Sequence, residues 1–258
     1  MHQRLLVITG AGISTGSGIP DYRDRDGAWK RPPPMTFQAF TGSEAARRRY
    51  WARSLLGWQR FGQARPNAAH YLLVQLQQRG KVQALVTQNV DGLHQAAGSK
   101  QVVDLHGRLD AIVCLGCGAR SARADFQHAL VAANPDWIEL PAQMAPDGDA
   151  DLDEVDFSGF QVPACRHCGG VLKPDVVFFG ESVPRERVAA VQAHLSAADG
   201  VLVVGSSLMV WSGYRFIKAA AQAGLPVAIL NRGLTRADAL ATLKCEEDIA
   251  SALAAGLA

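Results

Sequence analysis

The sequence lacks the features that would assign it to a membrane, to general nucleic-acid binding or to a repeat architecture. No apolar run reaches the roughly 18 residues that a membrane-spanning helix needs, so we expect no membrane partner. The 26 basic and 24 acidic residues leave a net charge of +2, without the strongly basic balance of a general nucleic-acid binder. There is no internal repeat or low-complexity tract. A core strand begins near Leu5 and leaves no room for a targeting segment, so we expect a cytoplasmic protein.

Cysteine is scarce, and its placement favours a metal over disulfides. Four of the five cysteines form two C-x-x-C pairs, Cys114 with Cys117 and Cys165 with Cys168. Without a secretory signal, such pairs read as metal ligands, and four thiolates predict one structural zinc ion in a closed site. Residues 119–164 must then loop out and return. His167 is a minor alternative ligand, and Cys245 is assigned no role.

The N-terminal segment has the pattern of a phosphate-binding unit. Residues 4–9 predict a buried strand that runs into a glycine-rich turn over 10–20, where backbone N–H groups can face an anion. The usual G-x-G-x-x-G pattern is not met because Gly16 comes one residue late, so a plain tight turn stays an alternative. The charged loop over 21–27 follows directly, which favours a lid over a cofactor above a solvated surface loop.

Small or polar residues follow four apolar runs that we interpret as parallel strands. The run over 82–87 is followed by Gln88, Asn89 and Asp91, and the run over 102–105 by His106. The run over 200–204 is followed by Gly205, Ser206 and Ser207, and the run over 226–230 by Asn231. The carboxyl ends of such strands meet at one edge of an open α/β sheet, where ligands bind. The sequence therefore predicts a dinucleotide and a substrate at this edge.

Most of the remaining segments are assigned to helices. We predict helices over 36–61, 66–79, 187–198 and 248–257. Tyr50 and Arg53 lie i, i+3 on the first helix, so they are candidates to hold a carboxylate or carbonyl of a ligand, with a solvated arginine face as the alternative. Residues 171–181 are expected to return to the main sheet, and residues 144–157 to form an exposed loop.

These elements together predict the fold class. We expect an α/β protein with a Rossmann-like parallel sheet, helices on both of its faces, and two small modules. Residues 1–30, 67–107 and 171–258 would form the main domain. A helical module would take residues 31–66, and a zinc-binding module residues 108–170.

The motifs, taken in order, resemble those of the sirtuins, a family of NAD-dependent protein-lysine deacylases. The matching stretches are 10–14, 17–23, 87–94, 105–107, the two cysteine pairs, 173–181, 205–207 and 231–233. Residues 49–53, 145–149 and 161–163 resemble the class II branch, which includes the animal mitochondrial sirtuin with lipoamidase, deacylase and ADP-ribosyltransferase activities. Tyr22 departs from the pattern, since many sirtuins carry phenylalanine there.

The resemblance implies that NAD lies along the sheet edge as a co-substrate. Its pyrophosphate would lie on the turn over 10–14, its adenosine near Asn231, and its nicotinamide ribose and carboxamide at Asn89 and Asp91. Tyr22 and Arg23 would close over the site. The implied cofactor-binding residues are Gly10, Ala11, Gly12, Ile13, Ser14, Pro20, Asp21, Tyr22, Arg23, Gln88, Asn89, Val90, Asp91, Gly205, Ser206, Ser207, Asn231, Arg232, Gly233 and, through its backbone, Ile249.

The resemblance also implies the reaction and the substrate site. The acyl-lysine oxygen would attack the ribose as nicotinamide leaves, and His106 would act as general base for a ribose hydroxyl, with Asn89 and Asp91 completing the catalytic set. The products would be lysine, nicotinamide and O-acyl-ADP-ribose. The peptide would add as a strand between residues 208–210 and the segment Val177, Phe178, Phe179, Gly180 and Glu181. Tyr50 and Arg53 would form part of an acyl pocket that favours longer or polar chains.

Other functions stay open at this stage. The same NAD site would serve protein mono-ADP-ribosyl transfer or lipoamidase activity. A non-enzymatic zinc-knuckle binding module is a further alternative, against which the intact His106, Asn89 and Asp91 argue. We expect acylated-lysine proteins or peptides as partners, no direct contact with nucleic acid, and a monomer.

Overall fold

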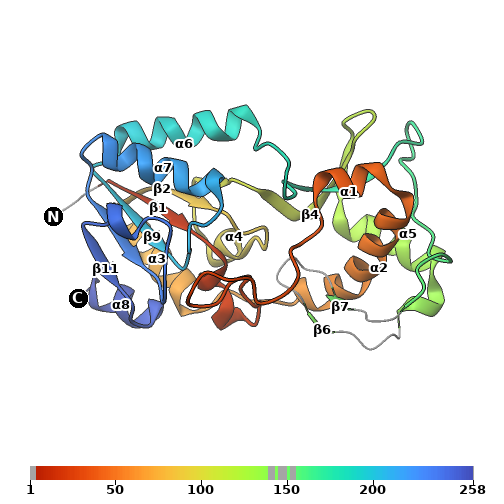
Figure 1. The fold of residues 1–258 in the computed structure, drawn as a ribbon, viewed down its shortest axis with the longest axis horizontal. Helices are drawn as coiled ribbons and strands as arrows, with labels where there is room; N and C mark the ends of the chain where they lie inside the picture. Colours follow the sequence, from red (N-terminus) through yellow and green to blue (C-terminus); the bar gives the residue numbers. More distant parts are fainter. Residues whose placement is uncertain (1–3, 139–142, 145–149, 152–154, 258) are drawn as a thin grey trace.

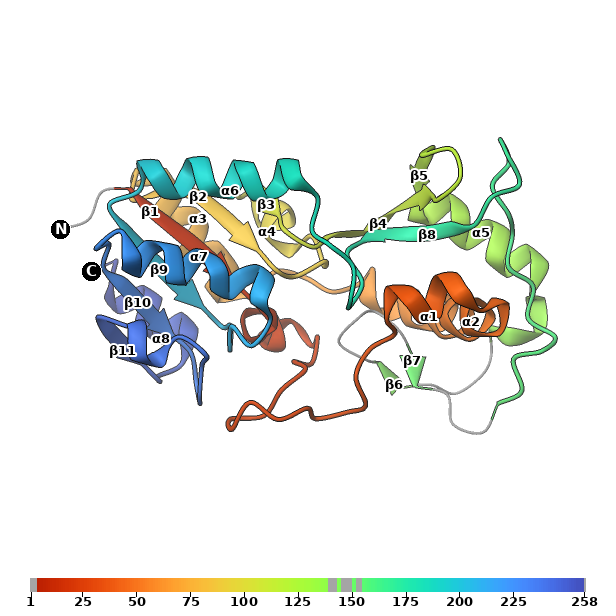
Figure 2. The same ribbon diagram turned by 45° about the horizontal axis from the view of Figure 1, so that its top comes forward.

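The computed structural model describes residues 4–138, 143–144, 150–151 and 155–257, which form two lobes along one long axis (Figure 1). The large lobe holds a parallel sheet between layers of helices, and the small lobe holds an antiparallel sheet packed on helices. Strands β4 and β8 run from the junction of the lobes into the small lobe (Figure 2). The predicted α/β fold class is confirmed.

The sheet of the large lobe has six parallel strands in the order β11-β10-β9-β1-β2-β3. Their bounds are β1 Leu5–Thr9, β2 Val82–Thr87, β3 Val102–Asp104, β9 Gly200–Val204, β10 Val227–Leu230 and β11 Leu243–Cys245. Strand order reverses between β1 and β9, which lie next to each other although they are far apart in sequence. In doubly wound sheets this switch point opens the crevice where ligands bind.

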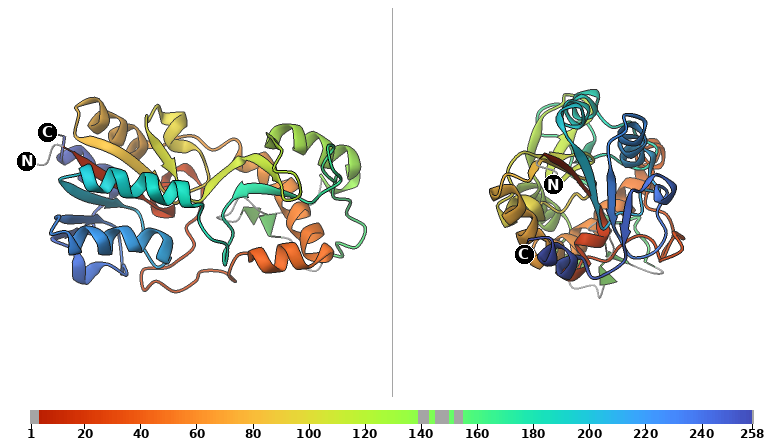
Figure 3. Two further views of the ribbon diagram at one scale, coloured as in Figure 1. Left: turned by 90° about the horizontal axis from the view of Figure 1, so that it is seen from above. Right: turned by 90° about the vertical axis from the view of Figure 1, so that its left-hand side faces the viewer.

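Helices cover both faces of this sheet, as its strand pattern requires (Figure 3). Helices α3 Ala68–Gln78 and α8 Ile249–Ala255 lie on one face, and α6 Arg185–Ala197 and α7 Trp211–Gln222 on the other. On β1, Leu6 and Ile8 pack toward α6 and α7, while Val7 packs toward α3 and α8. Successive strand residues point to opposite faces, so a strand that is apolar at every position is buried on both.

The small lobe combines residues from both predicted small modules. One antiparallel sheet has the order β5-β4-β8, and the two short strands at residues 143–144 and 150–151 pair as a second one beside the helices. The bounds are β4 Gly107–Cys114, β5 Arg120–Ala122, β8 Leu172–Val176, α1 Phe37–Gly42, α2 Glu44–Phe61 and α5 Arg123–Ala133. Trp51 of α2, Ile112 of β4 and Phe126 of α5 are buried in one hydrophobic cluster. The ranges 31–66 and 108–170 therefore share a core, and the division into three domains stays a prediction.

Two local predictions differ from the structure. Residues 172–176 do not return to the main sheet but form β8, which pairs with β4. This edge position suits Pro174, which has no N–H to donate. The helix predicted over 36–61 is broken at Ser43, which has extended backbone angles and whose hydroxyl accepts from the Ala46 N–H at 3.2 Å. Ser43 thus caps the start of α2.

The short elements complete the chain. They are η1 Ala11–Ile13, η2 Thr15–Ser17, α4 Leu93–Ala97, η3 Pro135–Trp137, β6 Gln143–Met144, β7 Ala150–Asp151 and η4 Asp238–Leu240. Residues 145–149, which carry part of the class II resemblance and of the expected exposed loop, lie outside the described residues. Among the helices that the structure describes, none has the length and apolarity to cross a bilayer.

Candidate active site

A cavity of about 1320 Å³ lies where the two lobes meet, along the carboxyl edge of the main sheet. His106, Asn89 and Asp91 line it, together with nearly all of the residues that the sequence assigned to cofactor and substrate. The exceptions are Pro20, Arg53 and Gly233, which are described but do not line this cavity. The structure thus brings together the ends of β1 and β10, at Thr9 and Leu230, which are 221 residues apart in the sequence.

The glycine-rich turn is shaped by its contact with the end of β9. The Gly12 N–H donates to the carbonyl of Gly205 at 2.8 Å. Gly205 has a φ of +61°, and a Cβ on it would lie 2.4 Å from the Ile13 nitrogen. A Cβ on Gly10 would lie 2.7 Å from the Ser206 Cβ. Only glycine allows this approach at the switch point, so these positions serve the backbone geometry of the turn.

Asn89, Asp91 and Ser14 form a hydrogen-bonded network that ties this turn to the end of β2. The Ser14 hydroxyl donates to Asp91 Oδ2 at 2.7 Å and accepts from Asn89 Nδ2 at 3.1 Å. Asn89 Nδ2 also donates to the Gly10 carbonyl at 3.1 Å, and Asp91 Oδ1 accepts from the Leu93 N–H at 2.9 Å. The amide and the carboxylate are therefore held in fixed orientations on the cavity wall.

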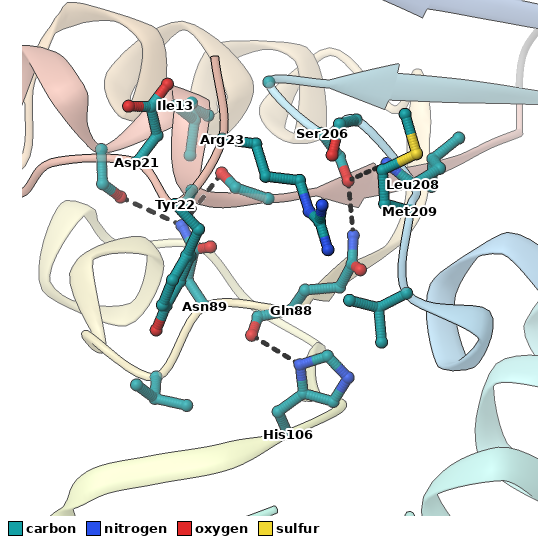
Figure 4. Close-up of a pocket in the computed structure, with 18 of the residues that line it drawn as sticks. Ile13, Asp21, Tyr22, Arg23, Gln88, Asn89, His106, Ser206, Leu208 and Met209 are labelled. Atoms are coloured by element: carbon teal, nitrogen blue, oxygen red, sulfur yellow. Dashed lines mark hydrogen bonds between the residues drawn. The ribbon is translucent and has the colours of Figure 1, made fainter. Parts of the chain in front are cut away.

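His106 lies at the end of β3, with both ring nitrogens engaged. Nδ1 lies 2.9 Å from the Gln88 carbonyl oxygen, and Nε2 lies 2.7 Å from the Ser212 hydroxyl. Gln88 is itself fixed, because its side-chain amide donates to Ser206 Oγ at 2.8 Å (Figure 4). Burial lowers the pKa of His106 to about 4, against the effect of the Gln88 carbonyl. The imidazole is thus neutral at pH 7, the state that a general base requires.

The charged loop after the turn is ordered around aromatic rings. Arg23 stacks over Trp29, with its Cζ 3.9 Å from the ring centroid, and donates to the Gly27 carbonyl at 2.7 Å. Tyr22 makes edge contacts with Trp29 and with Phe179, so the loop reaches across the cavity to the small-lobe side. Tyr22 and Arg23 line the cavity as the lid interpretation expects.

The residues predicted for the acyl pocket are separated by the structure. Tyr50 is buried, lines the cavity and packs edge-on against Phe178 with ring centroids 5.3 Å apart. Arg53, one turn further along α2, is half-buried and does not line the cavity. Gly233, with a φ of +87°, instead supports the lid: a Cβ there would lie 2.4 Å from the Arg25 carbonyl oxygen.

Sequence reasoning missed several residues of the cavity wall. Trp29, Asp248, Ser212 and Arg215 line it although none was singled out from the sequence. Asp248 had a readable signal as the N-cap of a predicted helix, and its carboxylate accepts from the Ser251 N–H at 3.0 Å. No such sequence signal marks Trp29, Ser212 or Arg215, because they belong to no motif and do not directly follow a strand.

A buried histidine pair lies beneath the network of Asn89 and Asp91. The rings of His70 and His94 are 4.8 Å apart, and His94 Nε2 lies 2.9 Å from the Thr9 hydroxyl. Within the described chain, His70 Nε2 and His94 Nδ1 are buried without a hydrogen-bond partner. Burial lowers the pKa of His70 to about 4 and that of His94 to about 3.

This pair predicts a loss of stability in mild acid. Below the unfolded pKa of about 6.5 the unfolded chain binds protons that the folded chain does not, so the free energy of unfolding falls as pH falls. Between pH 6.5 and pH 5 each histidine is expected to cost about 1.5 kcal/mol. Urea unfolding at pH 7, 6 and 5 checks this. His94→Gln should flatten the pH dependence, whereas equal slopes in both proteins would contradict the assignment.

The four paired cysteines meet at the far end of β4, in the small lobe. Their sulfur atoms all lie within 4.8 Å of one another, with Cys114 Sγ 3.5 Å from Cys168 Sγ and Cys117 Sγ 3.8 Å from Cys165 Sγ. In a tetrahedral site with Zn–S bonds of about 2.3 Å, the sulfurs lie about 3.8 Å apart. The Gly116 N–H donates to Cys114 Sγ at 3.3 Å, as thiolates prefer. The cluster therefore fits one zinc ion.

Comparison with known proteins places this geometry in a family. A sequence model described as the Sir2 family matches residues 10–212. An NAD-dependent protein deacetylase of Xanthomonas campestris pv. campestris (strain 8004) is 66% identical over 253 residues, which cover 98% of this chain and 86% of the relative. NAD-dependent protein deacetylase 2 of Bradyrhizobium diazoefficiens is 63% identical over 253 residues, covering 98% of this chain and 93% of the relative.

A solved structure agrees with the sequence relatives. A Sir2 protein with a p53 peptide and NAD+ has a TM-score of 0.76 and 29% identity to this chain, and the match covers 100% of this chain and 95% of the other. The family match includes the glycine-rich turn, both cysteine pairs and His106. The chain therefore belongs to the Sir2 family, the sirtuins.

Proposed function

We propose that this chain is an NAD-dependent protein-lysine deacylase that releases nicotinamide and O-acyl-ADP-ribose. The observation that carries the proposal is the meeting of His106, Asn89 and Asp91 in one cavity at the switch point of the sheet. The relatives named as NAD-dependent protein deacetylases, and the Sir2 structure with peptide and NAD+, support the same activity.

The residues of the cavity fit NAD in kind and in place. Gly10 and Gly12 hold the turn tightly against Gly205, so that its backbone is available to a pyrophosphate. Asn231, at the end of β10, would bind the adenosine. Asn89 and Asp91, on the other side of the switch point, would bind the nicotinamide ribose. When bound, NAD supplies the ADP-ribosyl group that accepts the acyl group from lysine.

The protein's own groups then have distinct tasks. His106 is the base that finally takes up the proton of a ribose hydroxyl, since its imidazole is neutral. Asn89 and Asp91 orient the ribose, because the Ser14 network fixes both side chains. Tyr22 and Arg23 would close over the site and shield the reactive ribose carbon C1′ from water, which limits the side reaction of NAD hydrolysis.

The peptide would bind between the two lobes as an added strand. Residues 177–181 and 208–210 both line the cavity, from the segment after β8 and from the segment before α7. A backbone that pairs with both would bring its acyl-lysine side chain toward His106. Backbone pairing reads little side-chain sequence, so we propose acylated-lysine proteins or peptides as a class of partner.

The test is an assay of deacetylation against NAD. An acetyl-lysine peptide should lose its acetyl group only with NAD present, and one nicotinamide should appear for each lysine freed. The unacetylated peptide is the control and should release little nicotinamide. Loss of acetyl groups without NAD, or no NAD-dependent loss from acetyl, glutaryl or lipoyl peptides, would contradict the proposal.

We also propose that Tyr50 forms part of an acyl pocket that favours longer or polar chains over acetyl. Tyr50→Phe is expected to lower the preference for glutaryl over acetyl about fivefold, since one hydrogen bond contributes about 1 kcal/mol. Arg53→Ala should change the ranking less, because Arg53 does not line the cavity. Competition between acetyl, glutaryl and lipoyl peptides measures the ranking. If both variants rank the acyl groups as wild type does, α2 does not contribute to the acyl pocket.

The remaining proposals concern the setting of the enzyme. We propose one structural zinc ion on the four cysteines, a class II sirtuin, and a cytoplasmic monomer that does not contact nucleic acid. The sulfur geometry and the net charge of +2 support the first and the last of these.

A further inference from the structure

The hydroxyl of Ser212 lies within hydrogen-bond distance of His106, the proposed general base. Ser212 Oγ is 2.7 Å from His106 Nε2, and Ser212 also lines the cavity. Ser212 lies in the first turn of α7, where the cap residue Val210 makes no side-chain cap bond. The Ser212 hydroxyl is therefore placed toward the histidine and toward the ligand space at once.

The hydrogen bonds of His106 fix the direction of this contact. The Gln88 carbonyl can only accept, so Nδ1 carries the proton and Nε2 is the acceptor in the neutral ring. The Ser212 hydroxyl must then donate to Nε2. The charges of Arg187 and Arg215 also oppose protonation of the ring and so favour its neutral form. No lone pair of His106 is left to accept a substrate proton directly.

The approach of α7 is built into the backbone. Gly213 follows Ser212, and a Cβ there would lie 2.6 Å from Gln88 Oε1. The Gln88 side chain has little freedom to yield, because its amide donates to Ser206 Oγ. Gln88 thus accepts from His106 Nδ1 through its backbone carbonyl, and its side chain packs against the first turn of α7. Ser212 and His106 are positioned against each other by one common neighbour.

We propose that Ser212 is a catalytic proton relay between the reacting ribose hydroxyl of NAD and His106, an inference that rests on the proposed deacylase function. As the hydroxyl oxygen forms its bond to the acyl carbon, its O–H bond breaks and the proton passes to Ser212 Oγ. The original Ser212 proton moves at the same time to His106 Nε2. Serine is regenerated, one proton resides on the imidazole, and no other reactant is needed.

Kinetics of Ser212 variants test the relay. Ser212→Ala is expected to lower kcat for deacylation roughly 10- to 100-fold, a part of what acid–base catalysis contributes. Ser212→Thr, which keeps the hydroxyl, should restore most of that loss, and Ser196→Ala on α6 is the matched control. In mixtures of H2O and D2O, the transfer of two protons in one step should make the wild-type rate a curved function of the D2O fraction. The rate of Ser212→Ala should depend on it linearly.

A measurement on the NAD-free protein separates this inference from the function. The nitrogen resonance of His106 Nε2 should show an accepted hydrogen bond in wild type and in Ser212→Thr, and lose it in Ser212→Ala. Unchanged or higher kcat in Ser212→Ala, an equal loss in Ser212→Thr, or an unaltered Nε2 resonance would overturn the relay. A wild-type enzyme without NAD-dependent activity but with the expected resonances would instead refute the proposed function.

Discussion

His106→Ala is expected to lower the rate of deacylation by at least about 100-fold, because general-base catalysis contributes roughly 10²- to 10⁴-fold. The variant loses the only imidazole on the described wall of the cavity. His106→Tyr should be equally inactive, since a phenol with a pKa of about 10 is protonated at pH 7. Product formation from an acetyl-lysine peptide under saturating NAD measures the loss.

The matched control is His128→Ala. His128 is exposed on α5 in the small lobe, away from the cavity, so its loss should leave the rate unchanged. Zinc content should stay at the wild-type value in the His106 variants, because His106 is not part of the four-cysteine cluster at the far end of β4. Substantial turnover in either His106 variant would overturn its assignment as the base.

Cys114→Ala should unfold the small lobe and abolish zinc binding. Structural zinc contributes apparent binding free energies of about 10–16 kcal/mol, and that energy is folding energy. Cys114 ends β4, whose Ile112 packs in the same core as Trp51, so loss of the metal site is expected to spread into α2. Because Tyr50 and Phe178 belong to this core, the cavity wall should also loosen.

Metal analysis and thermal unfolding check this expectation, and Cys168→Ala should behave in the same way. Cys245→Ala is the control, since Cys245 lies on β11 of the main sheet and outside the four-cysteine cluster. It should retain one zinc ion per chain and a wild-type melting temperature. A well-folded and active Cys114→Ala enzyme without metal would show that the cluster is not a structural zinc site.

Much of the cavity could be predicted because parallel strands impose a simple rule. Gln88 and His106 follow apolar runs, and the carboxyl ends of those runs share one edge of the sheet. The cysteine pairs were readable because C-x-x-C spacing reflects the local geometry of a metal site. In both cases a few neighbouring residues contain the whole signal, so no knowledge of distant packing is needed.

Other features depend on packing that the sequence does not display. The i, i+3 spacing puts Tyr50 and Arg53 about 60° apart around α2. Burial of Trp51 and Leu55 sets the rotation of α2, and that rotation leaves only Tyr50 on the cavity. Ser212 and His106 are 106 residues apart in the sequence, and they come into contact because α7 packs against the sheet. No local sequence pattern predicts this packing.

The most direct test of this account follows the acyl group itself. An acetyl-lysine peptide labelled with ¹³C in the acetyl group is incubated with NAD, and peptide and nucleotide products are weighed together by mass spectrometry. We predict that the label appears on ADP-ribose from the first turnover, with unmodified lysine left on the peptide. Labelled free acetate beside unmodified ADP-ribose, or a peptide that gains the mass of ADP-ribose, would contradict it.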